Sequence, residues 1–348
     1  MTNRTISLPK DALPHDTIIE WWYFNGHLAD ARGKKYSFMD CLFRADIKRV
    51  NIPFLKQPLK GMSAIPYGYF AHSVLSDLTG QKNYKEIQNI SIASRDSFTR
   101  PLFYANYLDP IAIKGFVGNE IAETEPGIFR LKTERLDLRL ESLKKPLLEG
   151  GAGHIRICGR ESYYYSLTDL RVSGMIRPGG EWIKIKGKAW MDHQWADESY
   201  KKDKWSWFSV QLGNGTDIMC VEYDDGIKKD YLADLIDRTG RSWHYKKCTL
   251  TPGKDIWKSK ATKAAFPMSW NIKIPERKID LAVRSLMGDQ EMIFGNINYW
   301  EGPTAAAGMM AGKKVKGSGF MELVGYPSDY NALSLMFRGF FKNPANSI

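Results

Sequence analysis

The chain has 348 residues, 43% of them hydrophobic and 26% charged, which is the composition of a globular protein of one or two domains. Its formal charge is +11, but the Lys and Arg residues form only short clusters, so we expect no nucleic-acid binding. No stretch approaches the roughly 18 apolar residues that a membrane-spanning helix needs.

Residues 1–16 lack the apolar core of a signal peptide. The four cysteines are far apart and form no Cys-x-x-Cys pair, which favours reduced thiols. We therefore expect a cytoplasmic protein. The basic charge favours anionic surfaces, so we also expect transient contact with an anionic membrane surface, to which the protein would be peripheral.

Residues 18–28, with the sequence IIEWWYFNGHL, are rich in residues that favour strands. Alternation along a strand puts Glu20 and Trp22 on one face and their neighbours on the other. A turn then leads to a second predicted strand at residues 36–43, giving a hairpin. The next predicted strand, residues 69–78, carries His72.

Residues 187–212 contain four tryptophans around an Asp-His pair. Read as an extended chain, this segment places His193 and Trp195 on one face, with Asp192 and Gln194 on the other. An imidazole beside an indole suits the wall of an apolar cavity. The alternative is that the aromatic residues fill a β core in which His193 is hydrogen-bonded.

The C-terminal part of the chain continues the strand pattern. Residues 205–212 and 218–223 flank Asn214-Gly215, which is a hairpin signal. Residues 304–312, TAAAGMMAG, are small and apolar and predict a mobile loop.

Many short alternating strands at roughly ten-residue spacing predict an antiparallel all-β protein of sandwich or barrel type. Closed barrels that enclose a ligand are a natural arrangement of such strands. The charged stretch at residues 196–204 is the best boundary, so we expect domains at 1–200 and 201–348.

Several segments, in order along almost the whole chain, match a known family: EWWYFNGHL (20–28), YYYSLTDLRVSG (163–174), GKAWMDHQWAD (187–197), WSWFSVQL (205–212), YWEG (299–302) and GFMELVGY (319–326). The chain resembles the carotenoid 1,2-hydratase (hydroxyneurosporene synthase) and AttH-like family. This resemblance implies two lipocalin-like antiparallel β-barrel domains in tandem. It also implies chemistry without a cofactor on a hydrophobic, often isoprenoid, substrate.

The resemblance also implies a site. In the hydratases a His, a neighbouring Trp, an acidic residue and a Tyr form the proposed catalytic set, and His193 and Trp195 match the first two. The family's Tyr-x-Asp falls on Cys220 and Glu222. Glu222 keeps a carboxylate, whereas the phenol is lost unless Tyr223 serves from a shifted register.

Hydration of an unactivated alkene needs a protonated acid, a base for water and a wall that stabilises a cation. The acid would be Glu222 or Asp192, the base His193, and the wall Trp195, Trp22 or Trp207. The remaining candidates for a substrate cavity are Glu20, His72 and Tyr223. Each of these residues also has a structural reading as a core or surface residue.

We expect no metal site, because no two of the six histidines stand two or four residues apart. Two classes of function stay open. One is an enzyme, a hydratase or by family analogy an isomerase or cyclase. The other is a lipocalin-like binder or carrier of a hydrophobic small molecule. A carboxylate and an imidazole that face each other would favour the enzyme.

Overall fold

The computed structural model describes residues 5–46, 48–49, 67–91, 102–107, 119–198, 203–294 and 297–330. Within these ranges the regular structure is β-strand, apart from short 3-10 turns at Lys10–Ala12 (η1), Glu149–Gly151 (η3) and Pro275–Arg277 (η4). No helix in the described ranges is long and apolar enough to cross a membrane. The expected all-β, antiparallel fold is confirmed.

The first sheet runs in the order β4-β3-β2-β1-β12-β11-β8-β7-β6-β5, and β9 and β10 pair with β11. Its strands are β1 (Ile19–Asp30), β2 (Lys35–Asp46), β3 (Tyr67–Asp77), β4 (Lys82–Ser91), β5 (Tyr104–Tyr107), β6 (Asn119–Glu125), β7 (Ile128–Lys132), β8 (Leu136–Ser142), β9 (Leu147–Leu148), β10 (His154–Ile157), β11 (Arg160–Ile176) and β12 (Ile183–Ala196).

The second sheet runs in the order β16-β15-β14-β13-β24-β23-β21-β20-β17, with β22 beside β23, and β18 and β19 form a separate pair. The strands are β13 (Lys204–Leu212), β14 (Asp217–Asp224), β15 (Lys229–Ile236), β16 (Ser242–Tyr245), β17 (Thr249–Pro252), β18 (Ile256–Lys258), β19 (Ala265–Pro267), β20 (Ser269–Ile274), β21 (Ile279–Ser285), β22 (Glu291–Phe294), β23 (Ile297–Met310) and β24 (Lys313–Val324).

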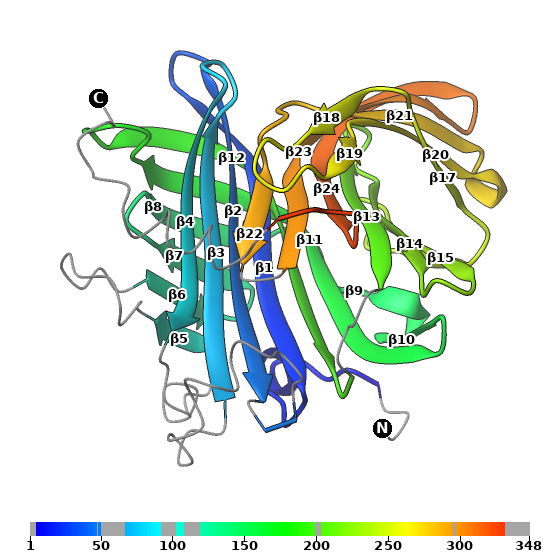
Figure 1. Cartoon of the computed structure of the whole chain (residues 1–348), viewed down its shortest axis with the longest axis horizontal. Coiled ribbons are helices and arrows are strands. Elements are labelled where there is room, and N and C mark those ends of the chain that lie inside the picture. Colours follow the sequence, from blue (N-terminus) through cyan, green and yellow to red (C-terminus); the bar gives the residue numbers. More distant parts are fainter. Residues whose placement is uncertain are drawn as a thin grey trace.

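Both sheets follow one plan, in which the first strand pairs with the last: β1 with β12, and β13 with β24. Figure 1 shows the two curved sheets side by side, with β1 of the first close to β23 and β24 of the second. The chain passes from one sheet to the other between β12 and β13. The division into domains 1–200 and 201–348 stays a prediction.

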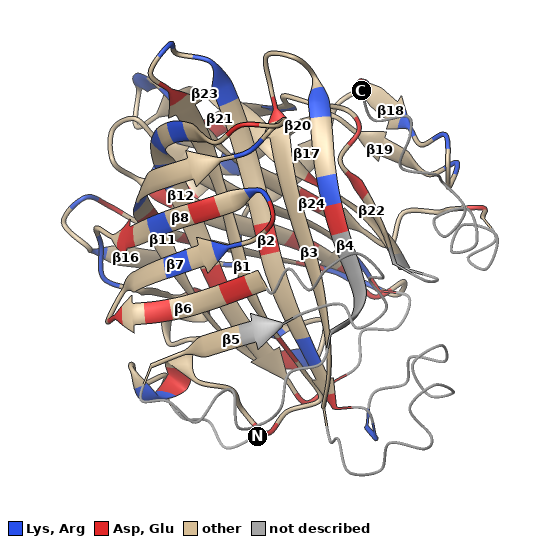
Figure 2. Ribbon diagram, turned by 90° about the vertical axis from the view of Figure 1, so that its left-hand side faces the viewer, with Lys and Arg blue, Asp and Glu red and all other residues tan. Residues whose placement is uncertain are grey.

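Alternation along the strands separates the core from the surface. In β8, Leu136, Leu138 and Leu140 are buried, while charged residues between them face outward. Figure 2 shows that charged residues of both signs occur along β6, β7 and β8, and Arg130 and Asp137 form an ion pair there.

The buried apolar side chains form three clusters. One lies on the inner face of the first sheet and includes Trp22 and Trp195. A second fills the second sheet around Phe208. A third joins the two sheets, because Tyr23 of β1 and Trp207 of β13 both belong to it.

The small apolar run at residues 304–312 differs from its prediction. Most of it lies inside β23, which pairs with β21 and β24. A Cβ at Gly308 would lie 2.0 Å from the Asp280 carbonyl oxygen, so the close approach of β21 requires a residue without a side chain there. The predicted loop is therefore wrong.

Candidate functional site

Strands β1 and β12 bring a carboxylate and an imidazole onto the inner face of the first sheet. Their register places Glu20 opposite Trp195, and Trp22 opposite His193. Because successive side chains alternate between faces, these four point to the same side. All four are buried.

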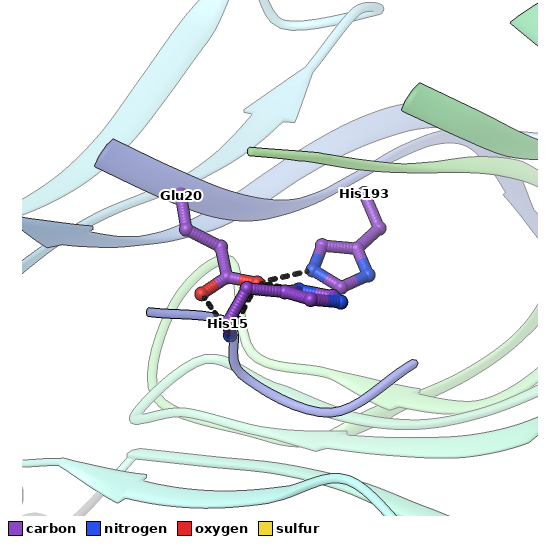
Figure 3. A group of neighbouring side chains, drawn as sticks. All are labelled: His15, Glu20 and His193. Carbon is purple, nitrogen blue, oxygen red and sulfur yellow. Dashed lines mark hydrogen bonds and ion pairs between the residues drawn. The ribbon is translucent and has the colours of Figure 1, made fainter. Parts of the chain in front are cut away.

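The Glu20 carboxylate accepts hydrogen bonds at both oxygens. Oε1 lies 2.9 Å from Nε2 of His193 and 2.8 Å from Nδ1 of His15. Oε2 lies 2.9 Å from Nη1 of Arg44 and 3.0 Å from the backbone nitrogen of His15. Figure 3 shows the two imidazoles converging on this carboxylate. Although Glu20 is buried, hydrogen-bond donors on several sides stabilise its negative charge.

The charge state of Glu20 follows from these contacts. Burial by itself would raise the pKa of Glu20, but hydrogen bonds from His15 and His193, and their charges, lower it to about 2. The Arg44 guanidinium adds a fixed positive charge against the other oxygen. Glu20 is therefore a carboxylate at neutral pH and has no proton to donate.

His193 is a buried neutral base. Burial lowers the pKa of His193 to about 4, although the bond to Glu20 and its charge act in the opposite direction. In a neutral ring the Nε2 atom carries the hydrogen, since it faces the carboxylate; this tautomer is assigned from geometry. The lone pair is then on Nδ1, which is buried and has no hydrogen-bond partner among the described residues.

Aromatic rings surround this imidazole. Trp22 stacks on His193 with ring centroids 4.6 Å apart, and Trp195 lies 4.8 Å away at a tilt. Tyr165 of β11 is opposite His193 in the register and meets its ring edge-on at 5.4 Å. These surroundings explain why the ring is held neutral.

The ligand atoms of His15, Glu20 and His193 lie within 4.8 Å of one another. Two imidazoles and a carboxylate are a set that Zn²⁺ or Fe²⁺ accepts in proteins. Here, however, the nitrogens are hydrogen-bonded to Glu20, whose other oxygen binds a guanidinium. A cation would have to displace those hydrogens beside Arg44, so we assign the set to hydrogen bonding.

Asp192 belongs to a different environment from His193. It lies on the opposite face of β12, where Oδ1 accepts hydrogen bonds from Ser166 Oγ at 2.5 Å and Trp190 Nε1 at 2.6 Å. Trp207 is on the same side and donates to the Tyr164 hydroxyl at 3.1 Å. The predicted roles of Asp192 as the acid beside His193, and of Trp207 as its wall, do not fit this placement.

Glu222 and Tyr223 lie on β14 of the second sheet. Glu222 accepts a hydrogen bond from Lys229 Nζ at 2.8 Å. The Tyr223 hydroxyl donates to Asp203 at 2.7 Å, and its ring belongs to the cluster between the sheets. The sequence leaves open whether Glu222 meets His193, and in the structure it is Glu20 that bonds His193.

His72 also lies away from His193. Its Nδ1 contacts the Tyr299 hydroxyl of β23, so this histidine is part of the contact between the sheets. Burial lowers the pKa of His72 to about 3. Of the predicted cavity residues, the structure places only Glu20 and Trp22 with His193 and Trp195.

The sequence interpretation missed His15, Arg44 and Tyr165. His15 precedes β1 in a segment without strand periodicity, so no pattern placed it. Arg44 lies opposite Glu20 in the β1–β2 register, and Tyr165 lies opposite His193. Both could have been found from the strand pairing, but pairing is not visible in a single sequence.

A dehydratase, asqC of Emericella nidulans, is 25% identical over 202 residues, which are 54% of this chain and 57% of that protein. The chain thus spans little more than half of that relative. The crystal structure of an AttH from Nitrosomonas europaea matches with a TM-score of 0.76 at 26% identity, covering 94% of this chain and 99% of the other.

Kievitone hydratase from Nectria haematococca has the same fold, with a TM-score of 0.72 at 16% identity, covering 92% of this chain and 93% of that one. These matches confirm the lipocalin-like fold expected from the resemblance. The AttH-like family model matches residues 1–326. The chain therefore belongs to the AttH-like family.

Proposed function

We propose that this protein is a hydro-lyase, an enzyme that adds water to a carbon–carbon double bond of a hydrophobic substrate or removes water to form one. The observation that carries the proposal is the buried Nδ1 of His193, which has no hydrogen-bond partner in the described part of the chain. The ring is held through Nε2 by the Glu20 carboxylate. A carboxylate that orients a neutral imidazole is a standard arrangement for a general base.

The proposed dehydration starts from a β-hydroxy carbonyl compound. Nδ1 of His193 takes the proton from the carbon next to the carbonyl, and the electron pair of that C–H bond forms the C=C bond. The C–O bond at the neighbouring carbon breaks, and the leaving oxygen takes the proton from the imidazolium and departs as water. The reverse sequence adds water to the conjugated alkene, and neither direction needs an oxidant or reductant.

The charge state of Glu20 selects the substrate class. Protonating an unactivated alkene, as in the hydration of a carotenoid, requires a carboxylic acid next to the double bond. Glu20 is ionised, and Asp192 and Glu301, two buried acids with raised pKa values, lie between the sheets. We therefore propose an alkene activated by a carbonyl group, ahead of a carotenoid.

The relatives support the same reaction class. One is named a dehydratase and another a hydratase, which are the two directions of one reaction. A family isomerase or cyclase would also use a buried base, but it would release no water. A non-catalytic carrier would bind the same apolar ligand and leave it unchanged.

The test begins by extracting the purified protein with organic solvent and identifying any bound small molecule by mass spectrometry. That compound, and a panel of apolar β-hydroxy ketones with their enones, is then incubated with the protein in D₂O. We expect interconversion of compounds that differ by one water, with deuterium entering next to the carbonyl. His193→Ala should lower kcat by ~10²–10⁴-fold, the usual contribution of a positioned base.

The control is His244→Asn, which removes another imidazole–carboxylate contact, that of His244 Nδ1 with Asp234 at 2.9 Å in the second sheet. This variant should keep wild-type turnover. Binding of an apolar ligand with no conversion and no deuterium exchange would show a carrier. Full activity in His193→Ala would refute the assignment of His193 as the base.

A further inference from the structure

The segment before β1 folds against the inner face of the first sheet. Ile6 is buried in the first cluster, and a Cβ at Gly153 would lie 2.5 Å from its Cδ1 atom, so the chain is seated closely there. Trp22 Nε1 donates to the Ala12 carbonyl at 3.3 Å. The segment therefore reaches one of the rings that stack on His193.

His15 is the residue of this segment that reaches the candidate site. Its backbone nitrogen and its Nδ1 atom both bond Glu20, and its carbonyl oxygen accepts a hydrogen bond from Arg44. Its ring lies flat on Trp195, with centroids 3.8 Å apart and an interplanar angle of 6°. His15 thus touches the carboxylate, the guanidinium and the indole at once.

Both ring nitrogens of His15 face carboxylates. Nδ1 lies 2.8 Å from Glu20 Oε1, and Nε2 lies 3.3 Å from Oδ1 of Asp11, a residue that is 1% exposed. A neutral ring can donate to only one of the two, whereas the imidazolium donates to both. Acidic and imidazole groups therefore alternate in the order Asp11, His15, Glu20, His193.

The contacts of His15 with Glu20 decide which ring nitrogen of His193 carries the hydrogen. Glu20 Oε1 is shared by the two histidines, while Oε2 is held by Arg44 and the His15 backbone. Without the His15 side chain, Oε1 would lose its second donor, so the carboxylate could turn. Nε2 of His193 would then lose a fixed acceptor, and its proton could move to Nδ1.

We propose that His15, held by Asp11, is a positioning residue that keeps Glu20 aimed at Nε2 of His193, so that Nδ1 stays free to accept the substrate proton. The N-terminal segment is then part of the site, although it lies outside both sheets. This inference rests on the proposed function for its effect on turnover, but its effect on the His193 ring can be measured without a substrate.

The test compares His15→Ala, His15→Asn and Asp11→Asn with the wild type in the full chain. The asparagine amide at position 15 can replace the Nδ1 donor to Glu20 but cannot reach Asp11. ¹⁵N-histidine NMR reports the tautomer of His193 directly, and circular dichroism and thermal unfolding report the fold. His244→Asn again serves as the control, because its ring contacts a carboxylate in the other sheet.

We expect the wild-type spectrum to show His193 protonated at Nε2. His15→Ala should mix in the Nδ1-protonated form and lower kcat by up to about 100-fold, the effect of a small misplacement of a reacting group, with KM within about twofold. His15→Asn should restore most of the Nε2-protonated form, and His244→Asn should change neither quantity.

The two proposals fail in distinguishable ways. A folded His15→Ala protein whose His193 spectrum equals that of the wild type would overturn the positioning role, whatever its activity. If the tautomer shifts but no variant or wild type converts any substrate, the positioning role stands and the hydro-lyase proposal fails. If His15→Ala unfolds, the folded Asp11→Asn protein decides: it should show some of the Nδ1-protonated form of His193, and a spectrum equal to that of the wild type would overturn the inference.

Discussion

Asp192 and His193 are neighbours in the sequence but lie on opposite faces of β12 and belong to separate polar networks. His193 is opposite Trp22 in the β1 register and bonds Glu20, whereas Asp192 is opposite Tyr23 and bonds Ser166. One strand thus supplies a base to the inside of the first sheet and an acid to the contact with the second sheet. The two groups have different chemical surroundings, and their titrations should differ.

The Asp192 network must hold a proton. Ser166 Oγ lies 2.5 Å from Asp192 Oδ1 and 2.6 Å from Glu149 Oε1, and all three residues are buried. A hydroxyl has one hydrogen and can donate to only one of the two carboxyl groups. The other carboxyl group must carry a proton itself to make the second contact.

Asp192→Asn should change how stability depends on pH. Burial raises the pKa of Asp192 to about 7, so the folded protein binds its proton more tightly than the unfolded chain. This stabilisation is complete below the unfolded pKa of 3.8 and is lost as the pH rises through 7. A shift of this size corresponds to a contribution on the order of 4 kcal/mol at low pH.

Asparagine is neutral at every pH, so the variant should lose this pH-dependent contribution to stability. Urea unfolding at pH 5 and pH 9 measures it: the wild type should lose more stability between the two than Asp192→Asn does. Equal losses in the two proteins would contradict a buried, protonated Asp192.

Glu20→Ala should be strongly destabilising, because it leaves Arg44 buried without its carboxylate. The Arg44 side chain is 4% exposed, and the loss of one partner of a buried ion pair costs about 3–5 kcal/mol. The matched control is Asp137→Ala, which breaks the exposed Arg130–Asp137 pair, worth ~0–1 kcal/mol. Chemical denaturation of both variants gives the comparison, and similar small losses would show that Arg44 finds other solvation.

The low pKa of Glu20 sets the opposite pH dependence from that of Asp192. The folded carboxylate is favoured, so its contribution is present above the unfolded pKa of 4.5 and is lost as the pH falls through about 2. In Glu20→Gln the acid limb of the stability curve should therefore be flatter. An acid limb as steep as that of the wild type would place the acid sensitivity elsewhere.

Tyr23 and Glu301 form a contact between the two sheets. The Tyr23 hydroxyl donates to Glu301 Oε1 at 2.5 Å, and burial, with the charge of Glu322 opposite it, raises the pKa of Glu301. A double-mutant cycle with Tyr23→Phe and Glu301→Gln should give a coupling energy of about 1–2 kcal/mol at neutral pH. A coupling energy near zero would mean that the two groups hold the sheets together independently.

Strand periodicity predicted the part of the candidate site that lies on strands. Glu20 and Trp22 were placed on one face, and so were His193 and Trp195, because alternation is a local property of the chain. Which strand faces meet depends on the β1–β12 register, so the sequence leaves open which carboxylate meets His193. Family position offers Glu222, and the structure places Glu20 there. Single-sequence patterns carry no information on such long-range pairing.

The remaining differences have the same origin. His15 acts from a segment with no period, and its role depends on contacts with Glu20 and Arg44. The run at residues 304–312 has poor strand formers, but it lies between β21 and β24, and pairing on both sides outweighs the low propensity of Ala and Gly. Tertiary contacts therefore decide both cases.

The β1–β12 pairing that sets the site can be tested at a glycine. A Cβ at Gly187 would lie 2.1 Å from the carbonyl oxygen of His27 and 2.9 Å from Leu28 Cδ2, so an alanine there must push β1 away from β12. We expect Gly187→Ala to lower the free energy of unfolding by ~1–3 kcal/mol.

Gly179→Ala is the control for this substitution, since a Cβ at Gly179 has no atom within 4 Å. Its free energy of unfolding should stay within ~0.5 kcal/mol of the wild type. Because Glu20 and His193 are held by the same two strands, the displacement in Gly187→Ala should also weaken their contact and alter the His193 NMR signals. Wild-type stability and signals in Gly187→Ala would mean that β1 and β12 can separate there without disturbing the site.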